Sequence, residues 1–428
     1  MKILVVGGGG REHAIIRKLK ESRKVDALYC APGNGGIAKD AECFSVKATD
    51  IDGMVALAKQ LAVDLVFVAP DDPLVLGMVD VMQAAGFATF GPNKAAAILE
   101  GSKAFSKELM KKYHIPTAKY EIFQEADAAI SYIREQNQFP TVIKADGLAL
   151  GKGVIIATNL VEAEQAVKNM MEDKMFGESG STVVVEEFLT GPEVSVLSFT
   201  DGKTVVPMVS SMDHKRALDH DEGLNTGGMG TVAPNPYYTK EMADTCMETI
   251  FLPTIQAMQA EGRPFQGCLY FGLMLTPNGP KVIEYNCRFG DPETQVVLPL
   301  LETDLVEIMK AISEQKLAEL PVVWKDGCAA CVVMASGGYP KKYETSLEIS
   351  GLDDGGQIAG CTVYHAGTKL AEDGKQLLTA GGRVLGVTAT AGDLPTALQK
   401  AYAGVKTIQW ENVHYRHDIG QRALKALQ

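Results

Sequence analysis

Residues 282–293 read VIEYNCRFGDPE, and this stretch decides which fold to expect. Side chains alternate between the two faces of a strand, so Glu284, Asn286 and Arg288 share one face. A carboxylate and an amide oxygen two residues apart suit Mg²⁺ (or Mn²⁺), which keeps water and nucleotide phosphates in its shell. A guanidinium one step further can grip a carboxylate or a phosphate with two N–H groups. We predict a metal site at Glu284 and Asn286 and a catalytic Arg288. The alternatives are a polar edge strand and a structural ion pair of Arg288 with Asp291 or Glu293.

A glycine-rich segment, KADGLALGKG at 144–153, joins two expected strands at 141–144 and 154–157. The segment is not a Walker A motif, because three residues separate Gly147 from Gly151 and Gly153 replaces the Ser or Thr. A glycine-rich hairpin with lysines can instead close over a triphosphate, and an expected helix at 103–113 begins with a further lysine. The alternative is a surface hairpin with solvated lysines. The predicted ATP contacts here are Lys103, Lys144, Gly151, Lys152 and Gly153.

The next expected strand, 182–186, ends in acidic residues, and another glutamate follows the Gly191-Pro192 turn. A strand end of this kind offers backbone groups to an adenine edge. A carboxylate shortly after it can accept hydrogen bonds from ribose hydroxyls. The alternative is that these acids are simply solvated. The predicted adenosine contacts are Glu186, Glu187, Phe188 and Glu193.

The first hundred residues alternate expected strands (3–6, 25–30 and 65–69) with expected helices (11–20, 51–61 and 75–85). This βαβαβ order predicts a parallel, doubly wound sheet. The glycines at 7–10 follow the first strand and suit an anion at a helix N-terminus. A dinucleotide fingerprint is disfavoured, since its third glycine would fall on Glu12 or His13. A tight turn without a ligand is the alternative.

The chain resembles the ATP-grasp ligases in the order of four features: a lysine at a helix start, a glycine-rich hairpin, an acidic strand end and the Glu284–Asn286 strand. Three stretches narrow the resemblance to the glycinamide ribonucleotide synthetase family: GGGREHA at 8–14, HDEGLNTGGMG at 220–230 and NCRFGDPETQ at 286–295. Shorter matches are APGN at 31–34, LEGSKAF at 99–105 and HAGTK at 365–369. The matches run from one end of the chain to the other, so they cover the whole architecture.

The resemblance implies a multidomain α/β and α+β chain. An N-terminal domain would span 1–101, an ATP-grasp domain 102–327 with a flap subdomain at about 117–190, and a small mixed domain 328–428. It also implies ATP-dependent ligation of glycine to 5-phosphoribosylamine in de novo purine biosynthesis, giving glycinamide ribonucleotide, ADP and phosphate through glycyl phosphate. One alternative is another purine-pathway ATP-grasp ligase or a carboxylase. A remote alternative is a nucleotide sensor without chemistry.

The resemblance further implies catalytic roles for Asp213 and Lys215 beside Arg288. The sequence departs from the family's pattern at two places. Asp71 replaces an expected glutamate, and the strand at 270–274 lacks the acidic metal ligand of many ATP-grasp enzymes. The implied substrate-binding residues are Gly9, Gly10, Arg11, Glu12, Gly33, Asn34, Asp71, His214, Thr226, Gly227 and Asp291.

Composition excludes several other classes. The 428 residues carry a net charge of −12, which argues against a broad nucleic-acid surface, and no apolar run of about 18 residues predicts a membrane span. Eight scattered cysteines favour a reducing cytoplasm. The pair Cys328 and Cys331 lies in an apolar run and predicts a buried strand rather than a metal site. We expect small-molecule substrates only and favour a monomer.

Overall fold

The computed structural model describes residues 1–148, 153–173 and 180–428, and its N-terminal part contains a parallel five-stranded sheet. The strand order is β3-β2-β1-β4-β5, which is the doubly wound arrangement predicted from the βαβαβ pattern. The strands are β1 (Lys2–Gly7), β2 (Ala27–Pro32), β3 (Glu42–Cys43), β4 (Leu65–Val68) and β5 (Ala88–Phe90). The helices are α1 (Gly10–Lys20), α2 (Ile51–Leu61), α3 (Asp71–Leu76), α4 (Met78–Ala84) and α5 (Lys94–Gly101).

One helix predicted for the N-terminal part has different bounds in the structure. The sequence predicted a single helix at 75–85, but α3 and α4 meet at Gly77, whose φ of +94° lies in the left-handed region. Only glycine adopts such a φ without strain, so the chain turns there. The helix α3 begins at Asp71, soon after β4 ends. The Asp71 carboxylate therefore lies at a helix N-terminus, beside the carboxyl ends of the parallel strands.

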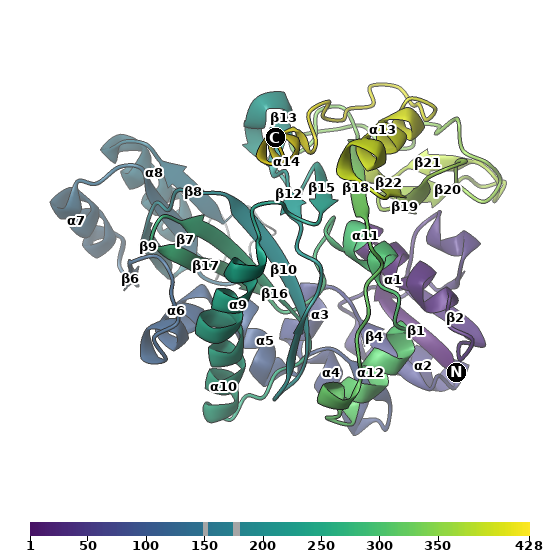
Figure 1. The fold of residues 1–428 in the computed structure, drawn as a ribbon, viewed down its shortest axis with the longest axis horizontal. Helices are drawn as coiled ribbons and strands as arrows, with labels where there is room; N and C mark the ends of the chain where they lie inside the picture. The colour runs from purple at the N-terminus through teal and green to yellow at the C-terminus, as the bar shows by residue number, and fades with distance from the viewer. Residues whose placement is uncertain (149–152, 174–179) are drawn as a thin grey trace.

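A second sheet, ordered β6-β9-β7-β8, forms the lobe that carries α7 and α8 in Figure 1. Its strands are β6 (Tyr120–Phe123), β7 (Thr141–Ala145), β8 (Val154–Ala157) and β9 (Val183–Glu187), and its helices are α7 (Ala126–Gln136) and α8 (Leu160–Met171). Ile143 and Val183 of the sheet pack against Ile130 and Val167 of the helices. β7 and β8 are antiparallel, as the predicted hairpin requires.

The central sheet, ordered β11-β10-β16-β17, is antiparallel throughout. Its strands are β10 (Glu193–Asp201), β11 (Val205–Pro207), β16 (Gln266–Thr276) and β17 (Gly279–Asn286), flanked by α6 (Lys103–Lys112), α9 (Lys240–Cys246) and α10 (Leu252–Ala260). The register shifts between Gly272 and Leu273, which face Glu284 and Val282, so Ile283 is the extra residue of a bulge. Ile283 is half-buried, whereas Val282 and Tyr285 on the same strand are buried. Bulges of this kind re-aim the neighbouring side chains.

The last large sheet, ordered β12-β15-β18-β22-β19, joins two parts of the chain. The strands β12 (Met212–Asp213) and β15 (Gly230–Ala233) come from the middle of the sequence and extend the sheet formed by β18 (Cys328–Ala335), β19 (Thr362–His365) and β22 (Arg383–Ala391). Asp213 therefore lies on a sheet shared with the C-terminal segment. The remaining elements are α11 (Thr294–Val297), α12 (Leu305–Ser313), β13 (Arg216–Leu218), β14 (Glu222–Asn225), β20 (Thr368–Leu370), β21 (Leu377–Thr379), α13 (Leu394–Val405) and α14 (Gln421–Ala426).

The predicted multidomain α/β and α+β class is confirmed by these sheets. The predicted strand around Cys328 and Cys331 is also confirmed, since both residues lie on β18 as free thiols and Cys331 is fully buried. Among the described residues, no helix is long and apolar enough to cross a membrane.

Candidate active site

Three stretches that are far apart in the sequence meet in the structure. Arg11, which follows the N-terminal glycines, donates from Nη1 to the Phe289 carbonyl at 3.3 Å. Arg383, the first residue of β22, donates from Nη1 to the carbonyls of Gly227 at 2.8 Å and Asp291 at 2.7 Å. The segments at 8–14, 220–230 and 286–295 therefore surround one region. Arg383 was not predicted, because nothing in its local sequence marks it.

The predicted metal ligands lie at the end of β17. Lys215 Nζ is 3.4 Å from Glu284 Oε1, and this lysine is the main reason why the pKa of Glu284 falls to about 2. Glu284 is therefore an ionised ligand at neutral pH. Asn286 donates its Nδ2 to Glu100 at 3.0 Å, which leaves the amide oxygen for a cation. An ionised carboxylate and a free amide oxygen fit Mg²⁺ or Mn²⁺ in which phosphates and water complete the shell.

Glu100, at the end of α5, organises this strand end and was not predicted as a site residue. Its carboxylate is 7% exposed and accepts from the Cys287 backbone N–H at 2.6 Å as well as from Asn286. It also pairs with Arg288 Nη2 at 3.1 Å. The sequence left open a structural ion pair of Arg288 with Asp291 or Glu293, but the structure pairs it with Glu100. The only signal was the LEGSKAF match at 99–105, which named no role for Glu100.

The predicted nucleotide lysines, Lys103 and Lys144, lie close enough to Glu284 that both help to lower its pKa, after the larger effect of Lys215. Lys144 Nζ is 3.0 Å from Glu186 Oε1 and donates to the Ile283 carbonyl at 3.0 Å. Lys107, which was not predicted, is 2.9 Å from Glu186 Oε2, and burial lowers its pKa to about 8. Glu186 is 4% exposed, so its side chain holds two lysines rather than reaching toward solvent. Lys103 donates to the Gly147 carbonyl at 2.7 Å, and burial lowers its pKa.

The other predicted adenosine contacts follow β9. Glu187 pairs with Lys281 at 2.9 Å, while Phe188 and Glu193 are exposed. Gly153 accepts a backbone hydrogen bond from Ala145 at 2.8 Å and closes the base of the hairpin. The predicted contacts Gly151 and Lys152 lie outside the described residues.

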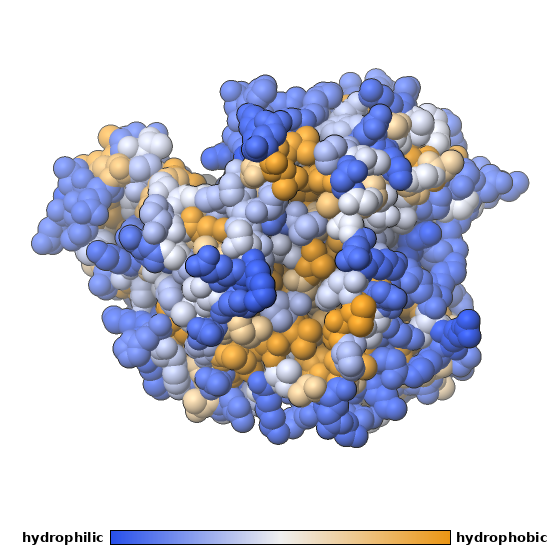
Figure 2. Space-filling model, viewed as in Figure 1, coloured by the Kyte–Doolittle hydropathy of each residue, from blue (hydrophilic) through white to orange (hydrophobic). Residues whose placement is uncertain are grey.

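Figure 2 shows the surface hollowed between the α7–α8 lobe and the lobe that carries α14, with β8 and β12 on opposite sides in this view.

Asp213 lies near a second carboxylate, the buried Glu293. Burial and the nearby Glu293 carboxylate raise the pKa of Asp213 well above its usual range, and burial also raises the pKa of Glu293. Tyr270 donates to Glu293 at 3.2 Å and shares a hydrogen bond of 2.7 Å with Ser195. The pair of carboxylates therefore retains a proton near neutral pH, in a position suited to a cationic group.

The predicted N-terminal substrate residues form a loop held by its own side chains. Glu12 accepts from the Gly9 N–H at 2.6 Å and from Arg11 Nε at 2.7 Å. Asn34 donates to the carbonyls of Gly8 at 2.9 Å and His365 at 2.8 Å. Gly10 is buried against Gln295, and Gly33 has a φ of +72°. Glu12 and Asn34 thus shape the loop, and Gly9, Gly10 and Arg11 are the parts that face the NCRFGDPETQ turn.

The remaining predicted substrate residues differ in whether their side-chain polar groups are already bonded within the protein. The Thr226 hydroxyl donates a hydrogen bond to the Lys215 carbonyl at 2.8 Å. Asp71 lies near Arg288: the negative charges of Glu100 and, to a smaller extent, Asp71 raise the pKa of Arg288 against the opposing effect of its burial. His214 is 1% exposed; its Nδ1 bonds the Gly230 carbonyl at 3.1 Å and its Nε2 accepts from the Gly420 N–H at 3.1 Å. Both ring nitrogens are occupied, so the structure does not place His214 as a substrate contact. Burial lowers its pKa to about 4, which keeps it neutral.

A lysine pair beneath a glycine hairpin, an oxygen-bearing strand end and an antiparallel central sheet define the ATP-grasp class of ligases. Comparison with a solved structure supports the fold. The chain is 17% identical, with a TM-score of 0.74, to the biotin carboxylase domain of a Hydrogenobacter thermophilus 2-oxoglutarate carboxylase, over 97% of this chain and 91% of that one. That structure is described as a complex with ADP, its magnesium salt and bicarbonate. At this identity the likeness concerns the fold alone.

More specific matches narrow the class. Residues 1–100, 101–294 and 329–422 match the N, ATP-grasp (A) and C domains described for phosphoribosylglycinamide synthetase. The phosphoribosylamine–glycine ligase of Caldanaerobacter subterraneus is 47% identical over 419 residues, covering 98% of this chain and 99% of that one. The Thermotoga maritima phosphoribosylamine–glycine ligase has a TM-score of 0.84 at 32% identity, over 98% and 100% of the two chains. The chain belongs to the phosphoribosylglycinamide synthetase family.

Proposed function

We propose that the protein joins glycine to 5-phosphoribosylamine with ATP, forming glycinamide ribonucleotide, ADP and phosphate. One observation carries the proposal: the family-specific stretches at 8–14, 220–230 and 286–295 meet beside Glu284, whose carboxylate faces Lys215 at 3.4 Å. The matched relatives named as phosphoribosylamine–glycine ligases support it.

The chemistry follows from the weakness of a carboxylate as an electrophile. Transfer of the γ-phosphoryl group to a glycine carboxylate oxygen would give glycyl phosphate. The amine nitrogen would then attack the carbonyl carbon, the C–O bond to phosphate would break, and the nitrogen would lose a proton. The protein has to align the reactants and balance charge, which needs no covalent nucleophile.

The described residues can divide this work. Lys144 and Lys103 would hold the phosphates. Arg288 would align the glycine carboxylate, Asp213 would receive the ammonium group, and Lys215 would balance charge near Glu284. Glu284 and Asn286 would hold Mg²⁺ or Mn²⁺, which supplies charge neutralisation of the phosphates.

An omission assay tests the proposal. ADP formation is expected to require both glycine and phosphoribosylamine, with glycinamide ribonucleotide found by mass spectrometry. Bicarbonate replacing glycine as the required substrate would instead favour the carboxylase alternative. Nucleotide binding with no ADP formed under any mixture would favour the sensor alternative.

Eight free thiols support the proposed cytoplasmic location, and the monomer stays a prediction for measurement in solution.

Lys144→Ala is expected to weaken ATP binding by about tenfold or more, because a charge-assisted contact contributes roughly 1.5–3 kcal/mol. Glycine binding should change much less. Calorimetric titration with a non-hydrolysable ATP analogue and with glycine measures both. Lys112→Ala, an exposed lysine that pairs with Glu261, is the matched control and should bind both normally. Equal weakening of glycine and nucleotide binding would remove Lys144 from the phosphate site.

Glycine binding is expected to release a proton near neutral pH. The pKa of Asp213 is raised by burial and by Glu293, so the free protein holds a proton that an incoming ammonium group would displace. Glycine affinity should therefore increase as pH rises toward the raised pKa of Asp213 and level off above it. Titration calorimetry in buffers of different ionisation enthalpy measures the proton count. Asp213→Asn should abolish the release, and unchanged release in that variant would contradict the assignment.

A further inference from the structure

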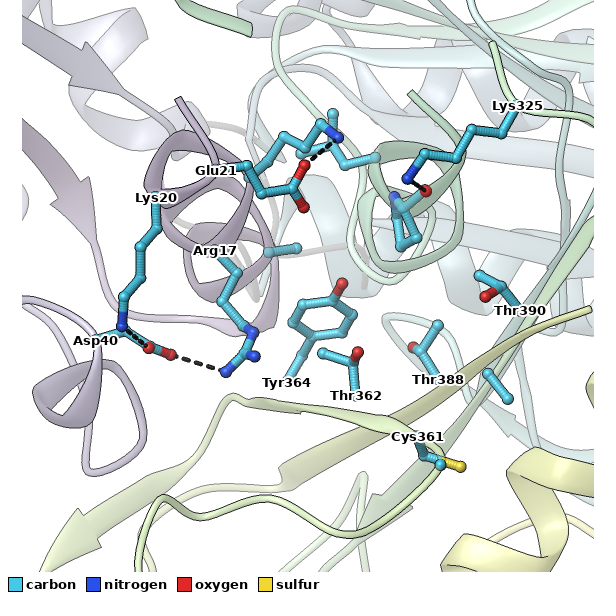
Figure 3. Close-up of a pocket in the computed structure, with 16 residues that line it drawn as sticks. Arg17, Lys20, Glu21, Asp40, Lys325, Cys361, Thr362, Tyr364, Thr388 and Thr390 are labelled. Atoms are coloured by element: carbon cyan, nitrogen blue, oxygen red, sulfur yellow. Dashed lines mark hydrogen bonds and ion pairs between the residues drawn. The ribbon is translucent and has the colours of Figure 1, made fainter. Parts of the chain in front are cut away.

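A cavity of about 580 Å³ lies between α1 and the C-terminal sheet, apart from every residue placed in the active site. Figure 3 shows α1 on one side and the strands β19 and β22 on the other. Its volume falls within the range of sites for small metabolites, roughly 300–1,000 Å³. The segment around Pro299 and the linker residue Lys325 complete the wall.

The sheet side of this cavity carries hydroxyl groups where a packed sheet face is normally apolar. Thr362 and Tyr364 share one face of β19, and Thr388 and Thr390 share one face of β22, because side chains alternate along a strand. Thr362 pairs in register with Thr388, so the four hydroxyls form one patch.

One of these hydroxyls is unused. Thr388 is 2% exposed, and its hydroxyl is occupied by a hydrogen bond with the Cys331 thiol. Tyr364 is 5% exposed, its hydroxyl forms no hydrogen bond with any described residue, and it points into the cavity (Figure 3). An unused buried hydroxyl carries a free-energy cost of about 1–3 kcal/mol, which a ligand oxygen would remove.

The helix side is positively charged. Arg17 and Lys20 both pair with the single carboxylate of Asp40, at 3.0 Å and 2.7 Å. Burial lowers the pKa of His13, the third partner of Asp40, so His13 stays neutral. Arg17 uses only Nη1 in this pair, and Lys325 donates to the Pro299 carbonyl at 3.1 Å. One positive charge from α1 and that of Lys325 thus remain uncompensated, in a chain whose net charge is −12.

We propose that this cavity binds the phosphate group of a small phosphorylated metabolite. Guanidinium, ammonium and hydroxyl donors on facing walls match the oxygens of a phosphate monoester. The volume exceeds that of phosphate alone, so it leaves room for a polar body such as a sugar. The site is independent of the proposed ligase reaction.

Cys361 supplies a reporter, since its thiol lines the cavity and is partly exposed. Cys328 is a matched internal control: it is also partly exposed and free, its pKa is likewise raised by burial, and it lies outside the cavity lining. Alkylation of each thiol in the full chain is followed by peptide mass spectrometry with ribose 5-phosphate, ribose or inorganic phosphate. Ribose 5-phosphate is expected to slow Cys361 alkylation by about tenfold at ten times its dissociation constant, and to leave Cys328 unchanged.

Two variants test the contacts. Tyr364→Phe removes a hydroxyl with no partner in the described protein, so the melting temperature should hold while the ligand binds about tenfold more weakly. Arg17→Gln should also reduce protection. Equal protection by inorganic phosphate would support the phosphate site and assign it to free phosphate. The proposal is overturned if ribose protects as well as its phosphate, if neither phosphate compound protects, or if protection is unchanged in both variants.

Discussion

Glu284→Gln is expected to lower kcat by about 10²- to 10³-fold, the range seen when one charge-stabilising contact is lost. The substitution keeps the shape of the side chain but removes the charge that Lys215 holds ionised, with the pKa of Glu284 at about 2. The variant loses the negative charge that the strand end supplies to the cation, and the neutral Asn286 oxygen does not replace that charge. The measurement is steady-state turnover over a range of Mg²⁺, together with Mn²⁺ binding followed by electron paramagnetic resonance in the presence of an ATP analogue.

Glu164→Gln is the matched control for that experiment. Glu164 is on the distant helix α8, where it pairs with Arg134, and its loss should leave turnover and metal binding unchanged. Near-normal turnover of Glu284→Gln at ordinary Mg²⁺ would remove Glu284 from the metal site.

Arg288→Lys is expected to lower kcat by about 10²-fold and to raise the glycine concentration needed for half-maximal rate. A lysine keeps the charge but not the planar pair of donors, so it cannot hold a carboxylate in line in the same way. The structure adds a competing role, because Arg288 pairs with the buried Glu100 at 3.1 Å. A purely structural ion pair predicts a lower melting temperature with turnover per folded molecule retained.

Steady-state kinetics against glycine and a melting curve, measured on the same preparation, separate these roles. Arg263→Lys is the matched control, since Arg263 donates to the Ala95 carbonyl at 3.0 Å and lies over the Phe105 ring. That variant should change stability alone. Unchanged glycine kinetics in Arg288→Lys would exclude Arg288 as a substrate contact.

Much of the fold could be predicted where the signal is local. The helix at 51–61 has the predicted bounds and the helix expected at 103–113 ends one residue earlier, because hydrophobic periodicity and the N-caps Asp50 and Ser102 both act within a few residues. The split at Gly77 was missed, since a lone glycine in a helical pattern does not reveal its φ. The joining of β15 to β18 was missed too, because pairing between distant strands depends on tertiary packing.

The site shows the same division. Glu284, Asn286 and Arg288 could be proposed together because strand alternation fixes their relative positions. Glu100, Lys107 and Arg383 could not, because each acts through partners brought close only by folding. Asn286 meets Glu100 across 186 positions of sequence, and Arg383 meets Gly227 across 156. His214 shows the converse: it was predicted as a substrate contact, yet its two ring nitrogens bond backbone groups.

The most direct test of the account is the fate of glycine's carboxylate oxygens. Glycine labelled with ¹⁸O in its carboxylate is supplied with ATP and phosphoribosylamine, and the inorganic phosphate is analysed by mass spectrometry. Phosphorylation of glycine followed by attack of the amine predicts one ¹⁸O atom in phosphate for each glycinamide ribonucleotide formed. Product formation with unlabelled phosphate would contradict activation of glycine by ATP.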